Sequence, residues 1–178
     1  IHWPAADDRP FEMTAVYRWT AADTLDFEIV VKAGQDLPKF ELFLSSYMNR
    51  NTKGWVYTSP TRHGTARQPE VFSPEVSPLI AGTYLAFPRD LKAAQLFYDG
   101  RWELGMSPVQ WTVSRYLAAP LGIRQDTVSG LAVAMMSRPQ DCFAVCMPYN
   151  ATPIDGVAGH YSMYLSLFGE DIKAGQAA

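Results

Sequence analysis

The sequence predicts an all-β fold, an antiparallel two-sheet β-sandwich with very little helix. Apolar and polar residues alternate with a period of two along much of the chain, which is typical of strands with one buried face. Turn-forming residues interrupt this alternation at intervals of roughly eight to twenty residues, as in hairpin-connected sheets. The 178 residues are 48% hydrophobic and 13% aromatic, enough for the core of one domain.

The first elements are predicted to be a hairpin and a third strand. Alternating runs occupy residues 11–19 and 25–31, and the polar turn 21–24 separates them. This order of strand, short polar turn and strand indicates an antiparallel pair. After a turn at residues 34–38, a third alternating run covers residues 40–47.

Residues 49–78 are predicted to form a long irregular excursion outside the sandwich. The segment is rich in polar and basic residues and contains prolines 60, 69, 74 and 78. Each proline lacks the N–H that a central strand needs, so we expect no central strand here. The predicted organisation is therefore one β-sandwich domain over residues 1–178, with this excursion at about 49–78.

The remaining strands follow after this segment. Asp99-Gly100 suits a type I′ turn and predicts a hairpin of residues 95–98 and 101–104. The one helical candidate is a short turn at residues 90–94. About ten strands in one domain must stack as two sheets or close into a barrel. The other predicted strands are residues 83–87, 109–116, 131–136, 142–147 and 161–168.

Charge and motif content exclude several classes of function. With 15 Lys and Arg against 18 Asp and Glu, the formal net charge is −3, so we expect no nucleic-acid partner. No run of about 18 apolar residues predicts a membrane span. The sequence lacks a phosphate-binding glycine loop and a dinucleotide fingerprint, so no cofactor is expected. Because the chain opens at Ile1, we expect a processed product or a part of something longer.

The cysteines and histidines do not predict a metal site. Cys142 and Cys146 share a predicted strand, where this spacing separates them by about 13 Å, too far for a disulfide. We expect two buried thiols. The three histidines, His2, His63 and His160, have no spacing that completes a zinc site.

The end of the third strand carries the first candidate binding residues. Ser45, Tyr47 and Asn49 fall on the face that also carries Glu41 and Phe43. Hydroxyl, phenol, amide and carboxylate groups beside an aromatic ring are the groups that bind sugar hydroxyls. The alternative is a solvated outer face of an antiparallel sheet.

Two further places offer candidate residues. His160 lies at the entrance of the strand 161–168 and is the best catalytic candidate, because imidazole titrates near neutrality; otherwise it is a surface or capping residue. The segment 49–78 combines aromatic residues with Arg62 and His63, which could clasp an anionic sugar. Its aromatic residues could equally cover the end of the core.

The order of these pieces resembles a known family. The first three predicted strands end in Ser45-Ser46-Tyr47-Met48-Asn49, which is similar to the His-Ser-Tyr-Phe-Asn segment of aldose 1-epimerases (galactose mutarotases). Residues 167–176 resemble the turn before the last strand of such β-supersandwich domains. The resemblance implies a sugar-binding sheet. It also implies impaired epimerase chemistry, because the family's catalytic acid, a histidine, is Ser45 here, and a hydroxyl is no proton donor near neutrality.

The expected function is that of a carbohydrate-associated β-sandwich, which binds a sugar or glycan without efficient epimerase chemistry. One alternative is a sugar-processing enzyme of the mutarotase, lyase or hydrolase type, in which His160 or His63 works with a carboxylate such as Glu41 or Glu103. A structural or assembly domain is the other alternative. A carbohydrate role would favour a secreted, periplasmic or cell-surface location.

Overall fold

The structure is a computed structural model, and it describes residues 1–49, 51–61, 67–74, 83–103, 111–149 and 161–178. Strands make up 61% of it and helix 4%. The predicted all-β sandwich is confirmed, and the described strands do not close into a barrel. No helix among the described residues is long and apolar enough to cross a membrane.

Two compact units make up the chain. The hairpin unit comprises Ile1–Phe40 and Glu170–Ala178, and the sandwich unit comprises Glu41–Gly169. Two strands, β4 (Leu37–Tyr47) and β12 (Ser162–Ile172), contribute residues to both units because the division falls inside them. The expectation of a single domain stays a prediction.

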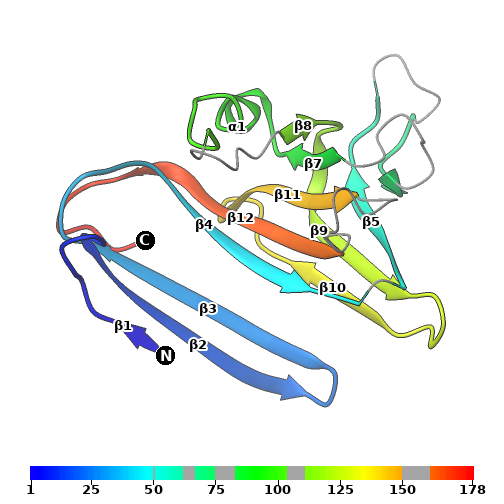
Figure 1. Cartoon of the computed structure of the whole chain (residues 1–178), viewed down its shortest axis with the longest axis horizontal. Coiled ribbons are helices and arrows are strands. Elements are labelled where there is room, and N and C mark those ends of the chain that lie inside the picture. Colours follow the sequence, from blue (N-terminus) through cyan, green and yellow to red (C-terminus); the bar gives the residue numbers. More distant parts are fainter. Residues whose placement is uncertain (50, 62–66, 75–82, 104–110, 150–160) are drawn as a thin grey trace. The chain divides into compact units, whose positions relative to one another are not determined.

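The hairpin unit contains the predicted strand pair, which is confirmed. Its three antiparallel strands are β1 (His2–Trp3), β2 (Phe11–Ala21) and β3 (Thr24–Ala33), drawn in blue in Figure 1. β2 and β3 pair over almost their full lengths. The chain end adds to the free edge of β3, because Ala178 and Val31 exchange two backbone hydrogen bonds of 2.9 Å.

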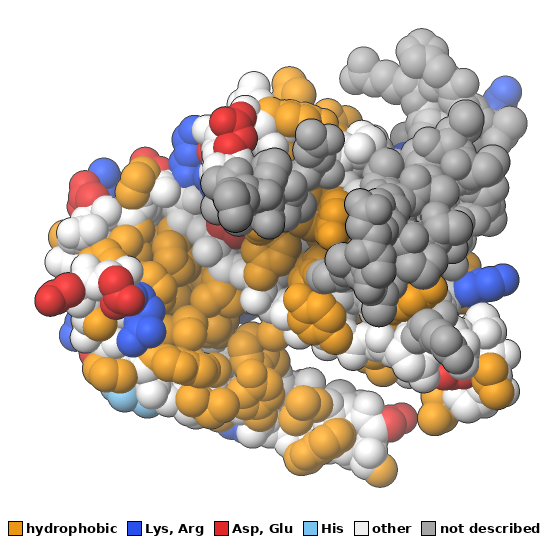
Figure 2. Space-filling model, in the orientation of Figure 1, with side chains coloured by type: hydrophobic (Ala, Val, Ile, Leu, Met, Phe, Trp, Pro, Cys, Tyr) orange, Lys and Arg blue, Asp and Glu red, His pale blue; other side chains and the backbone are white. Residues whose placement is uncertain are grey.

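One face of this hairpin is apolar along its whole length. Near its base, Ala15 and Val31 are buried, whereas Tyr17, Trp19 and Leu25 are exposed toward the tip. Figure 2 shows the resulting row of apolar side chains along the hairpin. Tyr17 packs on the cross-strand Phe27, with ring centroids 4.8 Å apart.

The larger sheet has five strands in the order β4-β12-β11-β7-β8. β11 pairs antiparallel with both β12 and β7, whereas β7 and β8 run parallel, so the sheet is mixed. The strands that join β4 and β12 in it are β11 (Cys142–Tyr149), β7 (Thr83–Pro88) and β8 (Trp111–Val113).

The smaller sheet of the sandwich unit has four antiparallel strands in the order β10-β9-β5-β6. Its strands are β5 (Thr52–Thr58), β6 (Glu70–Phe72), β9 (Leu117–Asp126) and β10 (Ala132–Met136).

The two sheets pack together through small residues on one side and long side chains on the other. A Cβ added to Gly122 on β9 would lie 2.6 Å from Sδ of Met163 and 3.1 Å from Cγ1 of Val145. Gly54 on β5 likewise has no room for a Cβ beside Met147. Glycine therefore lets the sheets approach closely, and Met147, Met163 and Val145 are fully buried in the resulting core.

The predicted excursion at 49–78 is wrong for its first part. β5 is a central strand of the smaller sheet, hydrogen-bonded to β9 on one edge and to β6 on the other. Alternate residues from Thr52 to Thr58 are buried, which is the period of a strand. The first proline of the segment is Pro60, beyond the strand end, so the composition of the whole segment concealed a regular strand of seven residues.

The predicted hairpin at 95–98 and 101–104 is also wrong. The structure has the helix α1 (Leu91–Gln95) here, which confirms the helical candidate at 90–94. Asp90 caps it, because its carboxylate accepts a hydrogen bond of 2.8 Å from the backbone N–H of Ala93. Leu96 and Phe97 continue in turns and are buried. The capped helix and these turns therefore take the place of the predicted strand 95–98.

β9 has no counterpart among the predicted strands. It contains Pro120 and Gly122, two residues that weaken a strand prediction. Both have a place here, since the Pro120 carbonyl accepts a hydrogen bond from Ser137 N–H at 3.1 Å and Gly122 permits the close sheet contact. Packing between sheets thus overrides local preference.

Candidate functional site

Aromatic side chains from four strands and one connection gather on one face of the five-stranded sheet. Register places Tyr84 of β7 beside Trp111 of β8, and it places Cys146 of β11 between Ala86 of β7 and Tyr164 of β12. We call the resulting surface the aromatic face. Its residues are Phe43, Tyr47, Tyr84, Phe97, Trp102, Trp111 and Tyr164.

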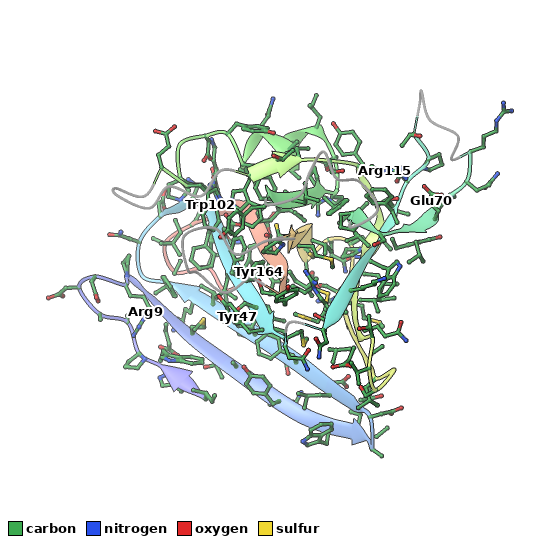
Figure 3. The ribbon with its side chains drawn as sticks, turned by 45° about the vertical axis from the view of Figure 1, so that its right-hand side comes forward. Arg9, Tyr47, Glu70, Trp102, Arg115 and Tyr164 are labelled. Carbon is green, nitrogen blue, oxygen red and sulfur yellow. The ribbon has the colours of Figure 1, made fainter. Side chains whose placement is uncertain are left out.

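The rings form a continuous set of mostly edge-to-face contacts. Phe43 lies 4.9 Å from Trp102 and 5.4 Å from Tyr164, measured between ring centroids. Trp102 lies 5.5 Å from Trp111, and Tyr47 lies 6.1 Å from Tyr164. Figure 3 shows Trp102, Tyr164 and Tyr47 following one another across the sheet. Edge-to-face packing leaves ring surfaces directed away from the contacts.

Both tryptophans of this face carry a buried indole N–H donor. Nε1 of Trp102 and Nε1 of Trp111 are buried, and neither has a hydrogen-bond partner in the described part of the chain. Buried polar groups in folded proteins nearly always have a partner, because an unpaired one costs about 1–3 kcal/mol. Two such donors in one cluster therefore require an explanation.

A charged group borders the aromatic face. Arg101 donates to Glu41 through Nη1 at 2.9 Å and to both carboxylate oxygens of Asp99 at 2.9 Å. The Glu41 side chain is only 8% exposed and that of Arg101 20%. Burial raises the pKa of Glu41, and this effect outweighs the lowering by Arg101. The site thus contains a buried carboxylate that costs energy to ionise.

Hydroxyl groups line the floor of the same face. Ser162 donates to the Tyr164 hydroxyl at 2.7 Å, and the Ser166 hydroxyl lies 3.6 Å from the Cys146 thiol. Both serines are fully buried. Burial raises the pKa of the Tyr164 phenol further above neutral pH.

The candidates at the end of β4 lie at the exposed end of this arrangement. Ser45, Tyr47 and Asn49 are all exposed, and Tyr47 is 68% exposed although it contacts Tyr164. Both polar atoms of the Asn49 amide are hydrogen-bonded within the chain: Nδ2 donates to Asp126 at 2.9 Å, and Oδ1 accepts from the N–H of Asn51. Tyr47 is therefore the predicted residue that the structure joins to the aromatic face.

The other candidates are not part of the described site. Arg62, His63 and His160 lie outside the described residues. Glu103 is exposed and follows Trp102 directly. A separate cation, Arg115, pairs with Glu70 and lies over the ring of Phe72, 3.9 Å from its centroid, and Figure 3 shows this pair away from Trp102, Tyr164 and Tyr47.

Sequence reasoning missed Trp102 and Arg101 because they were assigned to a hairpin that does not form. Trp111 lies in the predicted strand 109–116, but its ring neighbours come from distant parts of the chain. Only the strand order brings these rings together.

Comparisons with known proteins give no counterpart for this arrangement: no family model matches the chain, and neither a curated protein nor a solved structure matches it significantly. No group of three or more metal-binding side chains occurs among the residues that the structure describes. The interpretation of the site therefore rests on the chemistry of its own residues.

Proposed function

We propose that the sandwich unit binds a sugar or glycan on the aromatic face. The observation that carries this proposal is the pair of buried indole N–H donors that have no partner among the described residues, held in a cluster of rings that ends in the exposed Tyr47. A ligand hydroxyl is the group that such a donor lacks.

The chemistry of a sugar matches this combination of groups. The C–H faces of a pyranose ring are apolar and lie against aromatic rings, whereas its hydroxyls need donors and acceptors around the rim. Tyr47 and Tyr164 supply ring surface, Trp102 and Trp111 supply N–H donors, and Glu41 supplies a carboxylate nearby. The resemblance of residues 45–49 to the mutarotase segment supports the same ligand class.

A sugar-processing enzyme is the second candidate, and Glu41 favours it. A buried carboxyl with a raised pKa beside a binding surface can act as a general acid. Its Oε2 atom, however, already accepts a hydrogen bond from Arg101. Analysis of a retained glycan after incubation separates the two proposals, because an enzyme would change the glycan and a binding domain would return it unchanged.

A glycan array with the purified chain tests the proposal. Tyr47→Ala removes an exposed ring of the aromatic face, and Tyr116→Ala removes a half-exposed tyrosine outside it as the matched control. We expect Tyr47→Ala to weaken binding by about 10-fold, the effect of losing one stacked ring, and Tyr116→Ala to bind like the wild type. An array without any retained glycan, or equal binding by Tyr47→Ala, would contradict the proposal.

A further inference from the structure

The edge strand β10 has an unusual composition for an exposed sheet edge. Its five residues, Ala132–Met136, are all apolar and carry no charge. It pairs only with β9 among the described strands and ends the order of its sheet. Met136 is 70% exposed, Val133 45% and the preceding Leu131 75%. The strand is thus open to solvent at its edge and on its side chains.

The pairing with β9 determines which backbone groups of β10 point outward. The N–H of Asp126 donates to the Leu131 carbonyl, and the N–H of Ser137 donates to the Pro120 carbonyl. In an antiparallel ladder the direction of the backbone groups alternates from residue to residue. Leu131, Val133, Met135 and Ser137 therefore face β9. Ala132, Ala134 and Met136 direct their N–H and C=O groups to the open edge.

Edges of this kind are normally protected by charge, by proline or by shortness. The opposite edge of the same sheet follows that rule: β6 has three residues, and its Glu70 forms an ion pair with Arg115. β10 has none of these protections. An uncharged apolar edge with regularly spaced free donors and acceptors favours pairing with another strand.

We propose that two copies of this chain pair through β10, antiparallel and two-fold symmetric, with Ala134 on the axis. This register places Ala134 opposite Ala134 of the second copy and Ala132 opposite its Met136. These are the residues whose backbone groups point outward, so the pair can form about six new backbone hydrogen bonds. The sheet would continue across the dimer without a break.

The side chains suit this register. A small Ala132 meets a long Met136, and Val133 meets Met135, so both faces carry apolar pairs and neither sets two like charges opposite each other. Beyond the strand, Arg138 comes opposite Gly130 of the second copy. That turn is closed by the Asp126 carboxylate, which accepts hydrogen bonds from Ser129, Asn49 and Val128, and these bonds lower its pKa to about 2. Arg138 also pairs with Asp141 of its own copy, so each end of the interface brings this ion pair beside the turn that Asp126 closes.

The contact is small, so a weak dimer is expected. A single strand pair with its flanking side chains falls below the roughly 800 Å² per partner of a stable complex. Dissociation constants between about 10 µM and 1 mM follow for such transient interfaces. The inference does not depend on the proposed sugar binding, because β10 belongs to the other sheet of the sandwich.

Sedimentation equilibrium over this concentration range tests the dimer with charges placed on the axis. In a dimer of Ala134→Lys or of Ala134→Glu, the new charge would face the same charge at position 134 of the second copy. Like charges across an interface weaken association by at least about 10-fold. Each variant alone should therefore be monomeric, and an equal mixture of the two should dimerise again. Val71→Lys, on the opposite edge strand β6, is the control and should dimerise like the wild type.

Each other outcome overturns the proposal. A wild-type chain that stays monomeric to 1 mM has no such dimer. A dimer that persists in Ala134→Lys uses another surface, and growth beyond two copies shows an open rather than a closed association. Circular dichroism of each variant shows whether it folds. If Ala134→Lys does not fold, Ala134→Cys takes its place as the test of the dimer. The introduced thiols of the two copies would face each other on the axis and form an intermolecular disulfide under mild oxidation.

Discussion

Replacing Arg101 with methionine removes the cation that faces the buried carboxylate of Glu41. The Glu41 side chain is 8% exposed, and Arg101 Nη1 lies 2.9 Å from its Oε2. Breaking a buried ion pair from one side costs about 3–5 kcal/mol, because the remaining charge is left without compensation. Arg101 is itself 20% exposed, so we expect the lower end, a loss of about 3 kcal/mol at pH 7.

The loss should depend on Glu41 and on pH. Burial raises the pKa of Glu41 above its ordinary 4.5, and removing Arg101 raises it further. A carboxyl with a raised folded-state pKa stabilises the fold below its unfolded value and loses that contribution as the pH rises through the folded value. The defect of Arg101→Met is therefore largest at neutral pH and shrinks as the pH falls toward 4.5.

Urea unfolding at several pH values, followed by tryptophan fluorescence, measures these effects. In the Glu41→Gln background, Arg101→Met should cost at least about 1.5 kcal/mol less than in the wild type, which is the coupling expected of contacting charges. A cost that is the same in both backgrounds, or that does not change with pH, would show that Arg101 does not stabilise the fold through its ion pair with Glu41.

Three further predictions concern the core, the thiols and the chemistry. Gly122→Ala should lower the free energy of unfolding by about 1–3 kcal/mol, as urea titration measures, because the new Cβ would lie 2.6 Å from Met163 Sδ. Burial raises the pKa of Cys142 to about 12, so iodoacetamide at pH 8 should label it only in denaturant. On the proposed resemblance to aldose 1-epimerases, Ser45 stands where that family has its acid, at a cost of at least about 10²-fold, so polarimetry should show no acceleration of glucose or galactose mutarotation.

The strands that the sequence predicts correctly are those with an unbroken alternation and a clear turn at each end. β2 and β3 are examples, and their pairing follows from the short turn between them. β5 was missed because the prolines and polar residues of the whole segment 49–78 concealed it. Gly54 also interrupts its alternation, and glycine weakens a strand unless a neighbouring sheet needs the space. The close approach of the neighbouring sheet to Gly54 is a feature of the folded structure and leaves no local pattern in the sequence.

The candidate site was predictable only where a single strand supplies it. The alternation of side chains along β4 correctly placed Tyr47 on the same face as Phe43 and Glu41. Trp102 and Arg101 reach the same face through the connection after α1, whose helix is set by the Asp90 cap rather than by alternation. Residues brought together by strand order leave no local pattern in the sequence.

The indole N–H signals of the tryptophans report directly on ligand binding at the aromatic face. The chain has five tryptophans, and a ¹⁵N–¹H correlation spectrum records their N–H groups individually. On titration with a glycan retained on the array, the signals of Trp102 and Trp111 should shift and saturate, whereas that of Trp19, exposed on the hairpin unit, should stay in place. Saturating glycan that leaves both the Trp102 and the Trp111 signals unmoved would contradict binding on the aromatic face.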